Sequence, residues 1–172
     1  TFVEPSQIKE LEADENLNVY VIGSADYRCV MYNFQVCDLF QDVRVRQALN
    51  YATDGQAVVD AIAHGYGQIA YSPLQKNKFN CEDVVRYDYD PEKAKELLAE
   101  AGYPNGFECS LYVNGDVRTR SAQIVQAQLA EVGITVDIST YEWGALLDSL
   151  NAGDHEMFIL GWSNTSFDAD GS

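Results

Sequence analysis

The chain has 172 residues with 47% apolar content, which is enough for one compact globular domain with a sizeable core. Its 11 Lys and Arg residues against 27 Asp and Glu residues give a formal net charge of −16. This charge argues against nucleic acid or an anionic membrane as a partner, because both require a basic surface. No stretch approaches the roughly 18 apolar residues of a membrane-spanning helix. The chain starts at Thr1 without a signal peptide, so we expect a piece of a longer protein.

The first half of the chain predicts short helices and strands followed by a long loop. The expected elements are a helix over 6–14 capped by Ser6, strands over 19–22 and 29–34, a helix over 42–52, and a helix from Thr53-Asp54 that ends at Gly65. The two strands are β-branched and aromatic and are separated by a short turn, which favours a hairpin or two neighbouring strands. Residues 65–88 lack periodicity, and a loop of that length is usually functional or packed over a surface.

The second half predicts a regular alternation of strands and helices. Asp90-Pro91 begins a helix over 90–101. Strands over 107–113, 134–138 and 157–160 then alternate with helices from about Thr119 to 132 and over 143–150. Such a β-α-β-α-β unit with short connections indicates parallel strands joined by right-handed helical crossovers. The predicted fold class is therefore α/β, a mixed sheet flanked by helices, in a single lobe over 1–172.

The carboxyl ends of these three strands are expected to share one edge of the sheet. Residues 114–118, 140–143 and 161–168 follow the three strands, and ligands bind in the crevice at such an edge. Trp162 leaves a strand with four consecutive apolar residues, 157–160, and leads into a hydroxyl-rich loop. The alternative is that Trp162 caps the core and the loop is solvated.

Candidate chemistry in the sequence is sparse, and no catalytic residue, metal site or cofactor is predicted. His64 and His155 are expected to have surface or capping roles. The four cysteines form no CxxC pair; Cys29 and Cys109 are expected to be buried free thiols, while one disulfide among the four stays possible.

Charged residues near the predicted edge leave two further possibilities open. Arg118 and Arg120 have the chemistry to clamp a ligand carboxylate, although a solvent-facing first helical turn explains Arg120 equally well. Asp168 and Asp170 form a fragment of a calcium-loop pattern without its distal Glu. An acidic α/β enzyme that uses these two aspartates with a divalent metal is therefore the alternative function.

Four segments resemble one known family. Residues 42–54 (DVRVRQALNYATD) resemble the DVRVRQALNYAID helix of the family 5 extracellular solute-binding proteins, and residues 89–103 (YDPEKAKELLAEAGY) match that family almost letter for letter. Residues 133–136 with 141–143, and 161–162 with 168–170, are similar to its GI.V…YEW and GW……D.D segments. These matches occur in the family's order and cover most of the chain.

The resemblance implies the C-terminal lobe of a two-lobed periplasmic-binding-protein-like (type II) receptor of a bacterial ABC importer. Such a receptor is not an enzyme. It would be extracytoplasmic, either periplasmic or a cell-surface lipoprotein, with its anchor outside this chain. It would capture a peptide, a metal chelate or another small solute between its lobes and deliver it to the membrane permease subunits. The expected partners are thus the ligand, the missing N-terminal lobe and the permease.

The resemblance also directs attention to the loop after Trp162. Peptide-binding members similar to this chain have an Asp three residues after that Trp, which holds the ligand's α-amino group, but Thr165 stands here. A hydroxyl accepts a hydrogen bond but cannot form an ion pair with an ammonium group. Asp168 is one substitute; a ligand without a free amine is the other explanation. The expected ligand-binding residues are Trp162, Ser163, Asn164, Thr165, Asp168, Asn114 and Arg118.

Overall fold

The computed structural model describes residues 3–23, 26–72 and 84–163. The helices are α1 (Pro5–Glu12), the 3-10 helix η1 (Asp38–Gln41), α2 (Val43–Tyr51), α3 (Gly55–Ala63), α4 (Pro91–Glu100), α5 (Gly115–Ala130) and α6 (Trp143–Ala152). The strands are β1 (Asp26–Tyr32), β2 (Glu108–Val113), β3 (Thr135–Thr140) and β4 (Met157–Ser163). No helix in the described ranges combines the length and apolar character needed to cross a membrane.

The strands form one mixed sheet in the order β1-β4-β2-β3. β2 is parallel to both β3 and β4, whereas β1 is antiparallel to β4. The predicted β-α-β-α-β unit and the α/β fold class are therefore confirmed. Because β1 runs the opposite way, its first residues lie beside the last residues of β4, at the edge where the parallel strands end.

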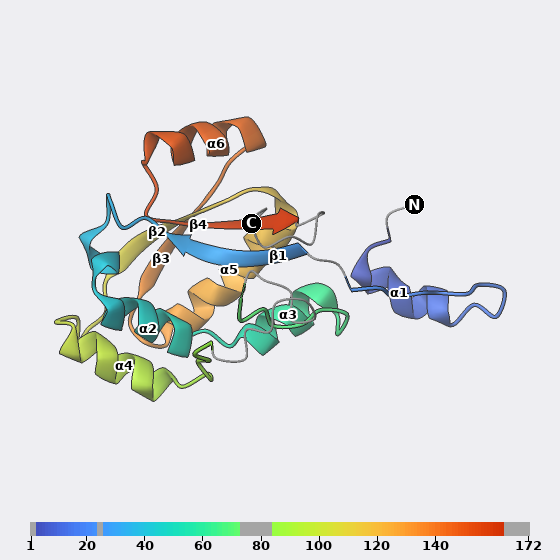
Figure 1. The fold of residues 1–172 in the computed structure, drawn as a ribbon, viewed down its shortest axis with the longest axis horizontal. Helices are drawn as coiled ribbons and strands as arrows, with labels where there is room; N and C mark the ends of the chain where they lie inside the picture. The colour runs from blue at the N-terminus through green and yellow to red at the C-terminus, as the bar shows by residue number, and fades with distance from the viewer. Residues whose placement is uncertain (1–2, 24–25, 73–83, 164–172) are drawn as a thin grey trace.

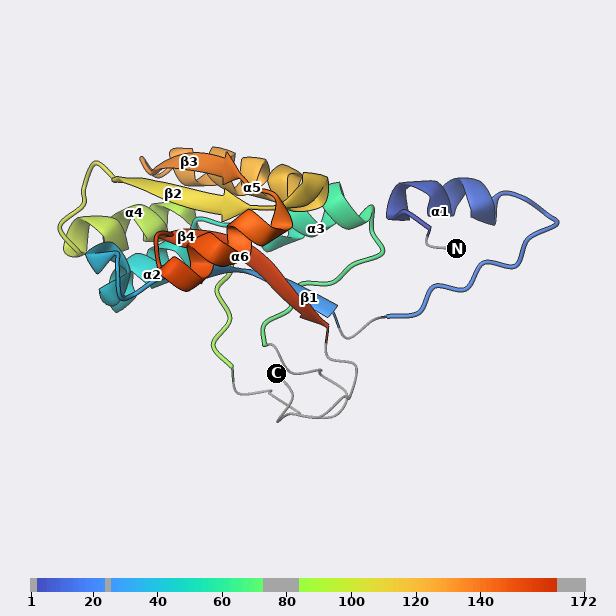
Figure 2. The same cartoon turned by 90° about the horizontal axis from the view of Figure 1, so that it is seen from above.

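The two faces of the sheet are covered unequally. Figure 1 shows α2 to α5 on one side of the sheet and α6 alone on the other. The main core lies on the first side, where the buried side chains of β2 meet the buried stripe of α5, and α2 packs against α4 beyond it. Figure 2 shows α1 away from the sheet, and α1 buries none of its residues.

The helix boundaries follow from local capping chemistry. The carboxylates of Asp42, Asp54 and Asp90 accept backbone N–H groups in the first turns of α2, α3 and α4, which stabilises these helix starts. Pro91 occupies the first turn of α4, where no amide hydrogen is needed. α3 ends at His64, whose φ of 51° is in the left-handed region, so the capping role predicted for His64 is confirmed.

Several predicted elements differ from those observed; the strand predicted over 29–34, for example, spans Asp26–Tyr32. Residues 19–22 form no strand, because no neighbouring strand in the described chain supplies hydrogen-bond partners, and Tyr20 and Ile22 are 83% and 87% exposed. α1 is capped by Glu4 with Gln7 in a capping box, and not by Ser6. α5 begins at Gly115 and not near Thr119, so it is about one turn longer than predicted.

The burial of the histidine and cysteine side chains agrees with the predictions in part. His155 is not a surface or capping residue: it is 8% exposed, its ring meets Phe158 edge to face at 4.9 Å, and burial lowers its pKa. Cys109 is a buried free thiol as predicted, and burial raises its pKa to about 12. Cys29 is free but only half-buried, while Cys37 is free and buried. Cys81 lies outside the described residues.

Candidate functional site

The ends of β2 and β3 are joined by a side-chain bond at the predicted edge. Asn114 follows β2 and precedes α5, and its Nδ2 donates to the carbonyl oxygen of Tyr141 at 2.8 Å. The amide of Tyr141 in turn donates to the carbonyl oxygen of Val113 at 2.9 Å. The expected convergence of residues 114–118 and 140–143 is therefore present. In this arrangement the Asn114 amide group holds two strand ends together.

Arg118 lies one turn into α5 and is half-buried. Its Nη1 donates to the carbonyl oxygen of Asn114 at 3.3 Å and to the Asn114 Oδ1 at 3.4 Å, both long for hydrogen bonds. Its Nε is buried and has no hydrogen-bond partner among the described residues. Burial and the nearby positive charge of Arg28 lower the pKa of Arg118.

Arg28 is a residue of this edge that the sequence analysis missed. It lies on β1 directly opposite Gly161 of β4. A Cβ added to Gly161 would lie 2.3 Å from the carbonyl oxygen of Tyr27 and 2.9 Å from the Cγ of Arg28. Only glycine permits this close approach, so the Arg28 side chain starts directly above the β4 backbone. Its spacing from Val30 and Tyr32 indicates only the face that it shares with them, because alternate strand residues lie on one face; its position opposite Gly161 comes from the register of β1 and β4.

Trp162 occupies the other face of the same strand. It lies opposite Tyr27 on β1 and is 43% exposed, so the predicted alternative in which it caps the core does not describe this lobe. Strand alternation puts Phe158 and its cross-strand neighbour Tyr112 on that face too, and the Tyr112 ring is 4.8 Å from that of Tyr141. The edge thus has an aromatic side and a basic side.

The loop after β4 contributes most of the remaining expected site residues. Ser163 is the last residue of β4, opposite Asp26. Asn164, Thr165 and Asp168, together with Asp170, lie outside the described residues. Their predicted contacts with the ligand stay predictions. Within the described ranges, no group of three or more His, Cys, Asp or Glu side chains is arranged to hold a metal ion.

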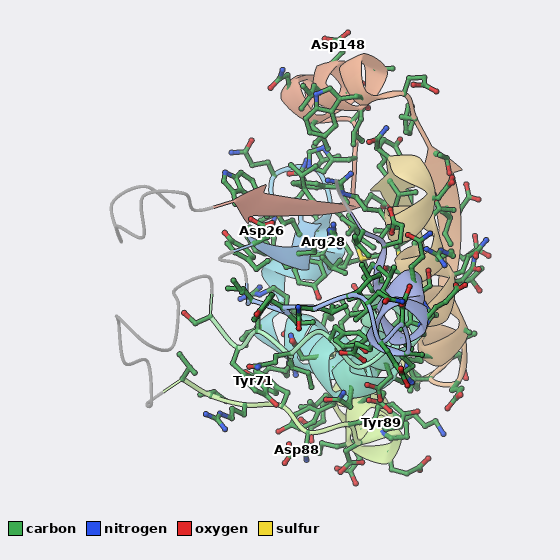
Figure 3. All side chains as sticks on the ribbon, turned by 90° about the vertical axis from the view of Figure 1, so that its right-hand side faces the viewer. Asp26, Arg28, Tyr71, Asp88, Tyr89 and Asp148 are labelled. Carbon is green, nitrogen blue, oxygen red and sulfur yellow. The ribbon has the colours of Figure 1, made fainter. Side chains whose placement is uncertain are left out.

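Two hollows in the described surface lie elsewhere. One, of about 430 Å³, lies where α2 gives way to α3 and is lined by Asp54, Tyr71, Asp88 and Tyr89, of which the last three are labelled in Figure 3. The other, of about 490 Å³, lies between α3 and α5 and includes Ile62 and Arg120. Neither contains Trp162, Asn114, Arg118 or Arg28. A crevice between two lobes would have half of its walls on the other lobe, so an open edge is what one lobe would present.

The comparison with protein-family models assigns this chain to a family. Residues 1–172 match the model of the bacterial extracellular solute-binding proteins, family 5 Middle. The chain belongs to this family. The family 5 chain is 41% identical over 138 residues to heme-binding protein A of Haemophilus influenzae, which covers 76% of the chain and 25% of that relative. It is 35% identical over 177 residues to the dipeptide-binding protein of Escherichia coli, covering 98% of the chain and 33% of that relative.

Solved structures agree with the family assignment. The family 5 chain resembles the ABC transporter-associated periplasmic binding protein DppA of Helicobacter pylori, solved in complex with the peptide STSA, with a TM-score of 0.87 and 34% sequence identity. The match covers 99% of this chain and 33% of that structure. The predicted periplasmic-binding-protein-like fold is therefore confirmed. The chain spans between a quarter and a third of the length of these three proteins.

Proposed function

We propose that the chain is most of the C-terminal lobe of an extracytoplasmic solute receptor. This receptor captures a peptide or a similar small solute between two lobes and delivers it to the permease subunits of an ABC importer. The observation that carries the proposal is the family match over residues 1–172, combined with a span of only a quarter to a third of the relatives. The receptor sits in the periplasm or on the cell surface as a lipoprotein.

The proposed ligand contacts lie at the carboxyl edge of the sheet. Trp162 presents an aromatic ring for stacking, and the 163–166 loop supplies hydroxyl and amide groups. Arg118 brings unused donors to the same edge, while Asn114 orders the backbone around it. The relatives differ in what their names say they bind, haem in one and dipeptides in another, so the proposal commits to a small solute with peptides as the first class to test.

Ligand capture between two lobes is tested with the full-length receptor and the 1–172 fragment side by side. Native mass spectrometry of the purified full-length receptor identifies a co-purifying solute, and calorimetry then measures its affinity for both proteins. We expect the fragment to bind at least about 100-fold more weakly, because half of the contacts belong to the other lobe. Equal and tight binding by both proteins contradicts the two-lobe proposal.

The role of Trp162 is tested against an exposed aromatic residue at the other end of the sheet. Phe34 follows β1, which ends opposite the first residue of β4, and is 50% exposed, close to the 43% of Trp162. We expect Trp162→Ala in the full-length receptor to weaken binding of the co-purified solute about tenfold, through loss of stacking and apolar contact. Phe34→Ala is expected to leave the affinity unchanged. Equal losses in both variants contradict a ligand-stacking role for Trp162.

A further inference from the structure

Arg118 of α5 and Arg28 of β1 both lie on the core-facing sides of their elements, near the carboxyl end of β4. On α5 the buried residues are Ala122, Val125 and Leu129, and Arg118 lies one turn before Ala122, on the same side of the helix. On β1, Val30 packs against the core, and Arg28 lies two residues before it on the same face. Each arginine thus continues the core-facing side of its element beyond the buried apolar residues.

The lobe itself leaves these two guanidinium groups incompletely satisfied. Among the described residues, no carboxylate lies within ion-pair distance of either one; the three ion pairs there involve Arg44, Lys93 and Lys95. The Arg118 Nε is buried without a partner, and its Nη1 contacts are at 3.3 and 3.4 Å. Leaving a charged donor buried and unpaired is costly, so the arrangement calls for an acceptor from outside the described lobe.

Like charge accumulates at this point although the chain is strongly acidic. The chain carries a formal net charge of −16, yet Arg28 is close enough to lower the pKa of Arg118. Asp26 lies on the same face as Arg28, two residues earlier at the outer end of β1 (Figure 3). An anion placed between the two arginines would relieve the repulsion between their charges.

We propose that Arg28 and Arg118 together form an anion subsite, which binds an oxyanion of the solute, a carboxylate or a phosphate, beside Gly161. The planar guanidinium group binds carboxylates and phosphates through pairs of parallel hydrogen bonds. Gly161 is part of the subsite because its missing side chain leaves room for Arg28. The subsite deepens the proposed function and rests on it for the identity of the solute, but its affinity for simple anions can be measured separately.

The first experiment uses the full-length receptor and simple anions. Thermal unfolding is followed in chloride, succinate or inorganic phosphate at matched ionic strength, since an anion that binds only the folded state raises the Tm. We expect succinate, phosphate or both to raise the Tm of the wild-type receptor above its value in chloride, and the more effective anion identifies the oxyanion class. Arg28→Gln and Arg118→Gln are each expected to abolish this rise.

Arg120→Gln is the matched control for these variants. Arg120 lies two residues after Arg118 on the same helix, but it is exposed and lines the hollow between α3 and α5. The Arg120→Gln variant removes the same charge at a site outside the subsite. The anion-dependent rise in Tm is therefore expected to persist. Arg28→Lys retains the charge but not the planar fork, and we expect an intermediate rise. Circular dichroism of each variant without added anion establishes that it folds.

The second experiment links the subsite to the solute. Calorimetry compares trialanine with trialanine amide, which lacks the terminal carboxylate. We expect the wild-type receptor to prefer the acid by about 10- to 100-fold, as the loss of charge-assisted hydrogen bonds predicts, and Arg28→Gln to bind both peptides equally. If the wild-type receptor binds neither peptide while the anion response is lost in Arg28→Gln and Arg118→Gln, trialanine is excluded as a ligand and the anion subsite stands.

Two results would overturn the subsite. The first is a wild-type receptor that responds to succinate and phosphate no more than to chloride. The second is an anion response that survives in either Arg28→Gln or Arg118→Gln, because the two residues are proposed to act jointly. If the first result occurs while the receptor binds trialanine and its amide equally well, the subsite is overturned but the proposed function of peptide capture still holds.

Discussion

Two arginine-bearing regions of this lobe differ in where their hydrogen bonds go. Around the start of α2, Arg44 binds the Asp42 carboxylate through Nε and Nη2 and the carbonyl oxygen of Glu100 through Nη1. Arg46 donates from Nη1 to the carbonyl oxygens of Phe40, at 2.6 Å, and Gln41, at 3.0 Å. At the edge of β4, Arg28 and Arg118 have no carboxylate partner among the described residues, and the Arg118 Nε is buried and unpaired.

This difference separates arginines with partners inside the described lobe from the two that are proposed to bind an anion. The guanidinium groups near α2 find acceptors inside the lobe and connect η1, α2 and α4, so their removal should affect folding. Those at the edge contribute few contacts to the lobe, so their removal should affect binding. The following substitutions test that separation, beginning with the largest expected change in stability.

Gly161→Ala should produce the largest loss. The new Cβ would lie 2.3 Å from the carbonyl oxygen of Tyr27, so β1 and β4 have to move apart. We expect the free energy of unfolding of the full-length receptor to fall by about 3 kcal/mol, measured by urea denaturation. Gly144→Ala is the control, because no atom lies within 4 Å of its added Cβ and alanine favours the helix α6. If Gly161→Ala changes the free energy of unfolding no more than Gly144→Ala does, β1 and β4 accommodate the added methyl group without cost.

Arg46→Met should have the next largest effect on stability. It removes the two bonds to the backbone carbonyls of η1 and the contact of the guanidinium with the Phe34 ring at 5.1 Å. We expect a loss of about 2 kcal/mol in the same urea experiment. The exposed Arg120, substituted in the same way, should change stability by only a few tenths of a kcal/mol, about the limit for surface sites. Equal effects at both positions would contradict the structural role of Arg46.

Arg118→Met should alter stability little. The side chain keeps its apolar length while a desolvated and poorly paired charge is removed, so the gain and the loss nearly cancel. We expect a change within about 1 kcal/mol of the wild-type value by urea denaturation. A loss as large as that of Arg46→Met would place Arg118 among the structural arginines and weaken the contrast between the two regions.

Asp42→Asn should remove a small pH-dependent contribution. Hydrogen bonds from the side chain and backbone of Arg44 lower the pKa of Asp42 in the folded protein. The ionised Asp42 therefore stabilises the fold above its unfolded-state pKa of about 3.9 and loses this effect as the pH falls through the lower folded-state pKa. Urea midpoints measured from pH 6 down to pH 2 should show a shallower acid decline in Asp42→Asn. Identical profiles would exclude a contribution of this pair.

Periodicity and capping predicted most of the fold because both depend on residues close in sequence. The buried residues of α4 recur at helical spacing, and those of β2 alternate as strand residues do, so each pattern fits only one type of element. Asp90 marks the start of α4 through its own capping hydrogen bond. Residues 19–22 show the limit of this reasoning. They have strand-like composition, but a strand needs a neighbour, and the described chain supplies none there.

The candidate site was predictable only in part. Asn114 and Trp162 were found because connection lengths place the ends of parallel strands at one edge. Arg28 was missed because it lies at the start of a strand whose antiparallel direction could not be read from its own residues. The burial of His155 escaped prediction for a similar reason, since Phe158 contacts its ring only after the turn before β4 has formed.

The sequence by itself determined the alternation of strands and helices, the caps of α2, α3 and α4, the family and the edge at which strand ends gather. Each of these depends on spacing along the chain. Only the tertiary structure decided that Arg28 lies opposite Gly161, that the buried Nε of Arg118 has no hydrogen-bond partner among the described residues, and that Trp162 occupies the other face. Those facts depend on the register and direction of β1 against β4, which join residues about 130 positions apart and leave no local signal.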